Sequence, residues 1–171
     1  MDERSIRPGE VVGDAPDRAD ATLIFIGRIR TPFHSLQSCP RHGGADGPLC
    51  RIETDAPWRR AMQGLAAHAE LQVLYWMDRA RRDLLVQAPR TGVGPTGTFA
   101  LRSPIRPNPI ATSIVAVEAI EDGAILARGL DCLDGTPLLD VKPWPQRIAR
   151  PDRADNPPDA PAASKPPEPG R

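Results

Sequence analysis

The sequence has no long hydrophobic segment. Nowhere in its 171 residues is there a run that approaches the roughly 20 apolar residues needed by a membrane-spanning helix. Residues 1–20 are too charged to resemble a secretory signal. We therefore expect a cytoplasmic protein with no membrane partner.

Cysteine and histidine are also scarce. Cys39, Cys50 and Cys132 are too few and too scattered for a disulfide framework, which a reducing cytosol disfavours, so we expect free thiols. His34 and His42 lie near the first two cysteines, but the CxxC or HxxxH spacing of structural zinc sites is missing. No metal is predicted.

Two common motifs of enzymes are absent. No GxGxxG follows the first strand-like run and strands do not alternate with helices, which argues against a doubly wound nucleotide-binding fold. The three histidines have no GxSxG or comparable partner, which argues against a nucleophilic triad.

Lysine is nearly missing, because Lys142 and Lys165 are the only lysines among 22 basic residues. Such a dominance of arginine fits phosphate recognition or a GC-rich genome, and composition leaves both open. The formal net charge is zero, but residues 22–147 hold 15 basic residues against 12 acidic ones. This excess of positive charge is compatible with a nucleic-acid partner but does not by itself indicate one.

What the sequence does contain is a series of short strand patterns. Residues 22–31 are rich in β-branched and aromatic side chains and stop at Pro32, which predicts a first strand. Further strand-like runs are at residues 49–53, 71–77, 84–88, 96–101, 110–120, 124–130 and 138–141. Asp-Gly pairs at 122–123 and 134–135 supply the positive φ of tight turns. Together they predict a mainly β fold, a small closed antiparallel β-barrel.

One helix and one long loop interrupt the strands. Residues 58–68 place apolar side chains at helical intervals after the start signal Asp55-Ala56-Pro57, which predicts the one substantial helix. The loop at residues 32–48 contains Gly43 and Gly44 and is long enough to wrap a ligand.

The two ends of the chain differ from the middle in composition. Residues 1–20 show no apolar periodicity, and residues 149–171 hold seven of the 21 prolines with little apolar bulk. We expect a flexible N-terminal tail and a Pro-rich, disordered C-terminal tail. The barrel domain is then expected at residues 21–148.

The most unusual stretch is residues 97–113, where three prolines interrupt a strand pair. Proline fixes φ and removes donors, so the segment is expected to be stiff and extended. Polar groups held on such a backbone can bind a charged small ligand at little entropic cost; they are Arg102, Arg106, Asn108 and Ser113. A structural loop with solvated arginines is the alternative.

A second stretch carries three carboxylates within ten residues, Asp131, Asp134 and Asp140. Such a group can hold ribose hydroxyls or a cation. It is equally typical of an Asx-type turn between two strands, and the spacing alone leaves both open.

Three blocks together resemble the TsaA-like family. They are Thr31-Pro32-Phe33 with Pro40-Arg41, residues 99–113, and residues 131–144. The most specific parts run from Arg102 to Ile110 and from Asp134 to Pro143, and the resemblance covers about residues 22–146. The family includes the bacterial enzyme that N6-methylates threonylcarbamoyladenosine at position 37 of tRNA.

The resemblance implies a small β-barrel that binds S-adenosylmethionine as its cofactor without a Rossmann fold, often as a homodimer whose site draws on both chains. It implies an S-adenosylmethionine-dependent methyltransferase acting on the anticodon loop of tRNA, with no metal. Two alternatives remain: an S-adenosylmethionine-binding module or sensor without tRNA activity, and a methyltransferase acting on a small molecule.

The family motifs also imply site residues. The cofactor-binding positions are Pro40, Arg41, His42, Asp78, Arg79, Arg102, Asn108, Thr112, Leu133, Asp134, Gly135 and Thr136. Arg41 and Arg102 suit the carboxylate of the methionine part. Asp134 suits ribose hydroxyls, and the amides of Gly135 and Thr136 suit the adenine edge. The motifs do not name the catalytic base, which stays unknown at this point; Asp78 is the one residue offered for it.

Four positions depart from the family pattern. His42 stands where glutamine is usual, Asp78 and Arg79 where histidine and glutamine are common, and Glu70 where histidine is frequent. These changes alter the charge and hydrogen-bonding groups of the site, and they bear on which molecule accepts the methyl group.

Overall fold

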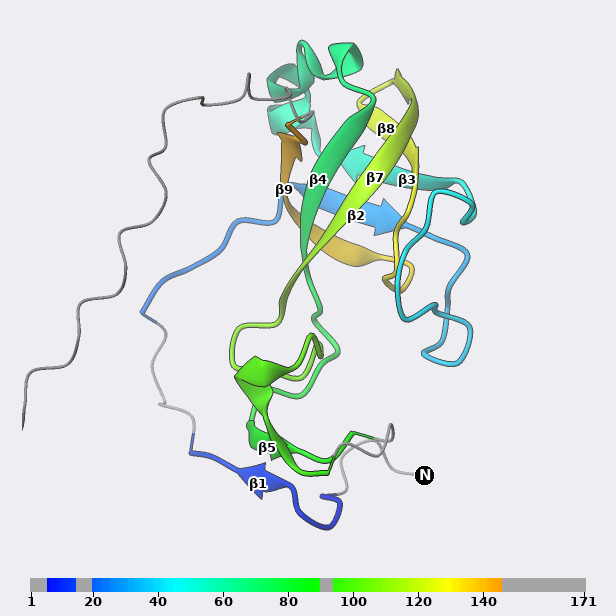
Figure 1. Ribbon diagram of the computed structural model, residues 1–171. Coiled ribbons are helices and arrows are strands. Elements are labelled where there is room, and N and C mark those ends of the chain that lie inside the picture. The colour runs from blue at the N-terminus through cyan, green and yellow to red at the C-terminus, as the bar shows by residue number, and fades with distance from the viewer. Residues whose placement is uncertain (1–5, 15–19, 90–93, 146–171) are drawn as a thin grey trace, which may run out of the picture.

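The main part of the molecule is a closed barrel of six strands in the order β2-β3-β8-β7-β4-β9 (Figure 1). The computed structural model describes residues 6–14, 20–89 and 94–145. The barrel strands are β2 (Gly27–Arg30), β3 (Cys50–Thr54), β4 (Glu70–Trp76), β7 (Ile110–Glu121), β8 (Ala124–Arg128) and β9 (Thr136–Pro143). Every neighbouring pair is antiparallel. The predicted mainly β fold and closed antiparallel barrel are confirmed.

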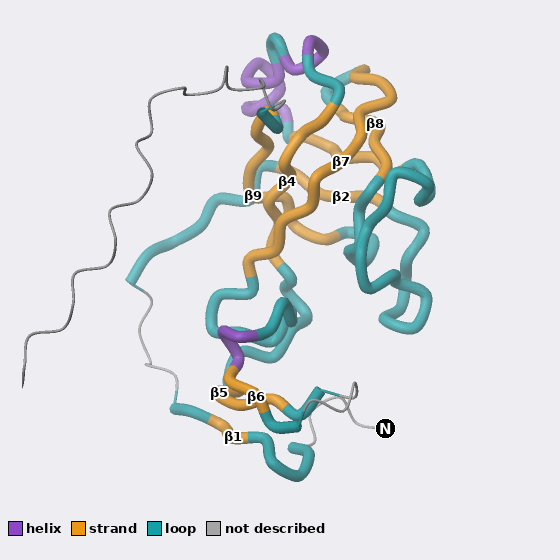
Figure 2. Tube along the Cα trace, in the orientation of Figure 1, coloured by secondary structure: helices purple, strands orange, loops and turns teal. Residues whose placement is uncertain are grey.

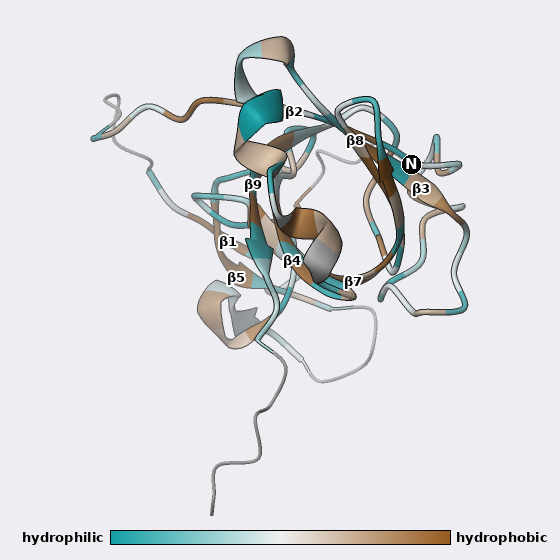
Figure 3. Cartoon of the chain, turned by 90° about the horizontal axis from the view of Figure 1, so that it is seen from above, coloured by the Kyte–Doolittle hydropathy of each residue, from teal (hydrophilic) through white to brown (hydrophobic). Residues whose placement is uncertain are grey.

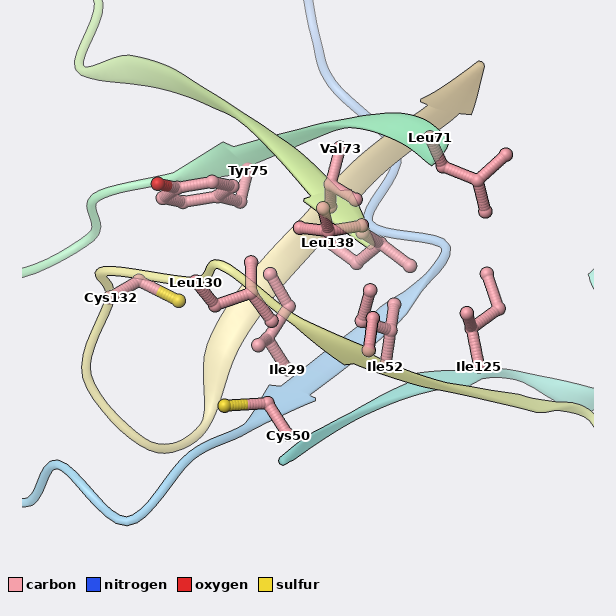
Figure 4. Packing of buried hydrophobic residues seen from close by; sticks show 12 residues of the cluster. Ile29, Cys50, Ile52, Leu71, Val73, Tyr75, Ile125, Leu130, Cys132 and Leu138 are labelled. Carbon is pink, nitrogen blue, oxygen red and sulfur yellow. The ribbon is translucent and has the colours of Figure 1, made fainter. Parts of the chain in front are cut away.

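The core lies inside the barrel and follows from period-2 alternation. In β4, Leu71, Val73 and Tyr75 are buried, and the residues between them are more exposed. They pack against aliphatic side chains of the other strands, such as Ile29 and Leu138. Figure 4 shows the Tyr75 hydroxyl pointing away from this apolar cluster. Full burial of each aliphatic side chain contributes roughly 1.5–3 kcal/mol.

The first predicted strand is shorter than expected. Strand β2 begins only at Gly27, and Leu23 and Ile24 are exposed. Gly27 lies so close to β3 that an added Cβ would be 1.9 Å from the Glu53 carbonyl oxygen. The apolar run before Gly27 has the composition of a strand, but among the described residues only Ile26 bonds to a strand, its amide donating to the Leu138 carbonyl of β9 at 2.9 Å.

The predicted helix at residues 58–68 is present as two 3-10 segments, η1 (Ala56–Met62) and η2 (Leu65–Ala67). They are separated at Gly64, which has φ 91° and interrupts the helix as a left-handed glycine does. Met62 and Leu65 pack against the core, so the segments lie over one end of the barrel (Figures 2 and 3). No helix in the described ranges is long and apolar enough to cross a membrane.

Between β4 and β7 the chain leaves the other end of the barrel in an excursion, residues 77–109 (Figure 1). It contains β5 (Leu84–Gln87), β6 (Thr96–Gly97) and the 3-10 segment η3 (Thr98–Ala100), so the strand predicted at 96–101 is only partly formed. Strand β1 (Val11–Val12) pairs with β5.

Strand β1 lies in the range that the sequence assigns to a flexible N-terminal tail. Of the two predicted tails, residues 1–5, 15–19 and 149–171 lie outside the described residues. The domain boundaries therefore stay predictions.

Candidate functional site

Two segments about 100 residues apart in the sequence lie side by side at the end of the barrel opposite η1 and η2. The loop at residues 31–49 joins β2 to β3, and the turn at residues 129–135 joins β8 to β9. The Thr31 amide donates to Asp134 Oδ1 at 3.2 Å, and the Thr31 hydroxyl donates to the Cys132 carbonyl at 2.9 Å. The Asp134 amide donates to the Phe33 carbonyl at 2.8 Å. We call this end, with its loop and turn, the loop end.

Farther along, the same two segments meet again at Cys39 and Gly43. The Cys39 thiol donates to the Asp131 carbonyl at 3.2 Å. An added Cβ on Gly43 would be 1.8 Å from the Gly129 carbonyl oxygen, so only glycine fits there. These contacts hold the Pro40-Arg41 motif against the start of the motif block at residues 131–144.

Backbone hydrogen bonds fix the turn that carries Leu133 to Thr136, one of them to β2 and one within the turn. The Gly135 amide donates to the Ile29 carbonyl at 2.8 Å, and the Thr136 amide donates to the Leu133 carbonyl at 3.3 Å. Gly135 has φ 81°, which favours glycine. Both amides thus have hydrogen-bond partners within the protein, and their contact with an adenine edge stays a prediction. The Leu133 amide has no partner among the described residues.

A hollow of about 450 Å³ opens in the loop end. Its lining residues are Phe33, Gln37, Ser38, Cys39, Pro40, His42, Gly43, Gly44, Asp46, Gly47, Pro48 and Leu130. Pro40 and His42, two of the predicted positions, therefore lie at its wall, and Arg41 between them is exposed.

Hydrogen bonds to its carbonyls hold the proline-rich segment, and two of them come from Arg106. Arg106 donates to the carbonyls of Ser103 at 3.0 Å and Leu101 at 2.6 Å. From the neighbouring strand, Gln87 Nε2 donates to the Ile105 carbonyl at 2.7 Å. Arg82 donates to the Pro107 carbonyl at 2.6 Å.

The other predicted positions lie where the excursion leaves and rejoins the barrel. Asp78 and Arg79 follow β4 and are exposed; Arg102 and Asn108 are exposed on the proline-rich segment. Thr112 is on the outer face of β7, where its hydroxyl accepts a hydrogen bond from Gln72 at 3.2 Å. The structure thus places the predicted residues in two groups, one on the loop end and one at the base of the excursion.

Several arginines of these groups are available for an anion. Arg41, Arg79 and Arg102 have no ion-pair or hydrogen-bond partner among the described residues. By contrast, Arg51 lies 3.6 Å from both Glu53 and Glu121. An unpaired guanidinium is free to bind a carboxylate or phosphate in a bidentate manner.

Sequence reasoning missed how a buried polar cluster joins the two groups. The Tyr75 hydroxyl lies 2.8 Å from Ser113 Oγ and donates to Asp131 Oδ1 at 2.5 Å. Ser113 donates to the same oxygen at 2.9 Å. Burial, and then the charge of Asp131, raises the pKa of Tyr75. The only tyrosine of the chain, at an inward position of a strand, was the available signal.

The cysteines behave as hydrophobic groups. Cys50 and Cys132 are buried in the core, and all three thiols are free. Burial, and then the charge of Asp131, raises the pKa of Cys39, which keeps it a hydrogen-bond donor. Within the described ranges, no three His, Cys, Asp or Glu side chains form a group that could hold a metal ion.

A six-stranded barrel with these motif blocks at one end defines a known family. Residues 28–149 match the family model of the tRNA-methyltransferase O N-terminal domain. The chain belongs to this family, and the resemblance expected from the motifs is confirmed.

Named relatives fall into two groups. A probable S-adenosyl-L-methionine-binding protein, VirR, of Rhizobium radiobacter is 47% identical over 143 residues, which cover 84% of this chain and 82% of the relative. The tRNA (adenine(37)-N6)-methyltransferase of Escherichia coli (strain K12) is 37% identical over 133 residues, covering 70% of this chain and 55% of the enzyme.

Solved structures of the same family share the fold. A crystal structure of TrmO from Pseudomonas aeruginosa matches with a TM-score of 0.62 at 29% identity, covering 84% of this chain and 64% of that chain. This chain thus spans somewhat more than half the length of the Escherichia coli enzyme and about two thirds of the TrmO structure.

Proposed function

We propose that this chain binds S-adenosylmethionine at the loop end and transfers its methyl group to N6 of threonylcarbamoyladenosine at position 37 of tRNA. The observation that carries the proposal is the pairing of the loop at 31–49 with the turn at 129–135. It brings two motif blocks of a tRNA methyltransferase family together beside a hollow of about 450 Å³. The expected location is the cytoplasm.

The donor is held by the residues that the protein leaves unpaired. Arg41 and Arg102 bind the carboxylate of its methionine part, because a guanidinium fork fits two oxygens. The turn from Leu133 to Thr136 lines the nucleoside, and the Leu133 amide joins the amides of Gly135 and Thr136 at the adenine edge. Pro40, His42, Asp78, Arg79, Asn108 and Thr112 complete the proposed contacts.

The chemistry requires placement and removal of one proton. S-adenosylmethionine supplies a sulfonium methyl group, which the adenine amine accepts in line. Asp78, exposed at the base of the excursion, is the proposed base for the proton that the nitrogen loses. Holding both reactants in place can supply about 7–11 kcal/mol of the barrier in favourable cases.

The proposed methyl acceptor is a base in a single-stranded loop of tRNA. A base in an anticodon loop can leave the stack and enter a pocket, while arginines hold the backbone. Because Arg41 and Arg102 are assigned to the donor carboxylate, Arg79, which has no ion-pair partner among the described residues, is the proposed contact to that backbone.

The proposed active form is a homodimer. Thr112 lies on the outer face of β7 between Ile110 and Ile114, which are 44% and 36% exposed. Phe99, on the excursion, is 83% exposed. A ligand position on an outer barrel face beside exposed apolar side chains is better enclosed when a second copy covers that face.

The test has two parts in one preparation. Calorimetry measures binding of S-adenosylmethionine, and transfer of a labelled methyl group is measured on tRNA that carries the threonylcarbamoyl modification. Binding with transfer supports the proposal. Binding without transfer favours a sensor or, if a metabolite is methylated, a small-molecule enzyme, and absence of binding overturns the proposal. The name of the Rhizobium relative, a probable S-adenosyl-L-methionine-binding protein, supports testing the binding-only alternative.

A further inference from the structure

The cluster of Tyr75, Ser113 and Asp131 has no role in the function proposed so far. Tyr75 is 1% exposed and Ser113 is 9% exposed, so both hydroxyls are withdrawn from water. Burying a hydroxyl costs free energy unless it is hydrogen-bonded. Both hydroxyls donate to one oxygen, Asp131 Oδ1, at 2.5 and 2.9 Å. The carboxylate is thereby fixed in one orientation.

The cluster lies in two of the motif blocks and contacts the residue next to the Pro40-Arg41 motif of the third. Tyr75 is near the end of β4, shortly before Asp78, and Ser113 follows Thr112 in β7. Asp131 precedes the turn at Leu133, and its carbonyl accepts the Cys39 thiol of the facing loop at 3.2 Å. The cluster therefore sets the relative positions of the two groups of predicted site residues.

One oxygen of the cluster remains available. Asp131 Oδ2 has no hydrogen-bond partner among the described residues. No buried side-chain oxygen or nitrogen in the described part of the chain lacks a partner, and Asp131 is half-buried, so Oδ2 is not fully buried.

The neighbouring carboxylates are used differently. Asp134 Oδ1 accepts the Thr31 amide and ties the loop to the turn. Asp140 accepts the Val141 amide and pairs with Lys142.

We propose that Asp131 binds the α-ammonium group of the donor through Oδ2, with Oδ1 held by Tyr75 and Ser113. The inference rests on the proposed function. The methionine part carries an ammonium and a carboxylate on one carbon, so its site needs an acidic and a basic group close together. Cys39 binds the Asp131 carbonyl, and Arg41 is two residues farther along that loop. A carboxylate that is already oriented gives a strong charge-assisted bond at little entropic cost.

Two ligands separate this role from a structural one. S-adenosylhomocysteine contains the amino-acid part, and 5′-methylthioadenosine keeps the adenosine but lacks that part. We expect Asp131→Asn to weaken binding of S-adenosylhomocysteine about tenfold or more and to change that of 5′-methylthioadenosine less than about twofold. Calorimetry measures the first ligand, and competition against it measures the second. Asp122→Asn is the matched control, because Asp122 has φ 47° in an exposed turn, a conformation that asparagine tolerates.

A second variant covers the case in which Asp131→Asn does not fold. Tyr75→Phe keeps the ring and removes one bond to Oδ1, and we expect a smaller loss that is again confined to S-adenosylhomocysteine. Equal losses for both ligands would show that the cluster only supports the fold or holds the ribose, and unchanged affinities would show that it has no part in binding. Either result overturns the inference, while failure of the unmodified protein to bind either ligand overturns the proposed function itself.

Discussion

The two ends of the barrel differ in whether their arginines have partners. At the end under η1 and η2, which we call the capped end, a hollow of about 330 Å³ is lined by charged side chains that include Arg51, Glu53 and Arg59. Arg51 lies 3.6 Å from Glu53 and from Glu121, and Arg59 donates to the Thr54 carbonyl at 3.4 Å. At the loop end and the base of the excursion, Arg41, Arg79 and Arg102 have no partner among the described residues.

The difference agrees with a structural role for the hollow at the capped end and with the proposed donor site at the loop end. Charges that neutralise each other leave little attraction for an ionic ligand, whereas unpaired arginines retain theirs. The polar groups that are buried at the loop end, Tyr75 and Ser113, are satisfied by a single carboxylate oxygen. Substitutions at the capped end should therefore change stability alone, and those at the loop end should change ligand binding.

The largest expected effect is on stability at the capped end. Ile125 is fully buried, and Ile125→Ala should lower the free energy of unfolding by about 2–5 kcal/mol, because it removes buried methylene groups and leaves a cavity. Urea unfolding measures the loss. Donor affinity of the folded variant should stay unchanged, and a parallel loss of affinity would break the distinction between the two ends.

The next effect concerns affinity at the base of the excursion. Arg102→Ala should weaken S-adenosylmethionine binding about ten- to hundredfold, because a charge-assisted bond to the donor carboxylate is lost. Calorimetry measures the change. Arg60→Ala is the matched control: Arg60 is exposed in η1 at the capped end and should leave the affinity as it is. Unchanged affinity in Arg102→Ala would contradict the assignment of that residue.

A third prediction concerns alkaline pH. The pKa of Tyr75 is raised in the folded protein, chiefly by burial, whereas an unfolded tyrosine ionises near pH 10. Above about pH 10 the unfolded state loses this proton and the folded state keeps it, so stability falls by about 1.4 kcal/mol per pH unit. Because Tyr75 is the only tyrosine, tyrosinate absorbance should appear only with unfolding.

The control for that titration is Tyr75→Phe, whose stability should decline less steeply above pH 10. Tyrosinate absorbance that develops near pH 10 in the folded protein would mean that the hydroxyl is accessible and the cluster open.

The smallest effect is expected at the ion pairs of the capped end. Glu121 is 55% exposed at its side chain and lies 3.6 Å from Arg51, and exposed pairs of this kind contribute little. Glu121→Gln should change the free energy of unfolding by at most about 0.5 kcal/mol, measured by urea unfolding, with donor affinity unaltered. A larger change would show that the charges of this hollow act as a network.

Much of the barrel could be predicted because its signals are local. Alternation around Leu71 and Val73 marks β4, and the turn at Asp122-Gly123, with φ 47° and 76°, joins β7 to β8. The errors arose where the local structure depends on contacts with other parts of the chain or on the backbone conformation of one residue. The run before Gly27 looks like a strand, but Leu23 and Ile24 are exposed and only Ile26 bonds to a neighbouring strand. Gly64 divides the expected helix into two 3-10 segments.

For the site, the sequence identified motif blocks but not the use of their atoms. It singled out the 134–136 turn, yet the amides of Gly135 and Thr136 are consumed by the Ile29 and Leu133 carbonyls. It also left Arg106 as a ligand candidate, although Arg106 braces the proline-rich segment. Hydrogen-bond partners that are distant in the chain cannot be read from spacing.

The sequence by itself determined the β-barrel class, the family and the motif blocks, because strand periodicity, Asp-Gly turns and proline-rich segments act over a few residues. Only the tertiary structure decided which polar groups form hydrogen bonds within the protein and which have no partner among the described residues. Closure of the barrel joins β4, β7 and the 129–135 turn, so that Tyr75 and Ser113 meet one oxygen of Asp131 and leave the other open. Which groups stay free depends on long-range packing, because each hydrogen bond formed within the protein uses a donor or acceptor that could otherwise bind the ligand.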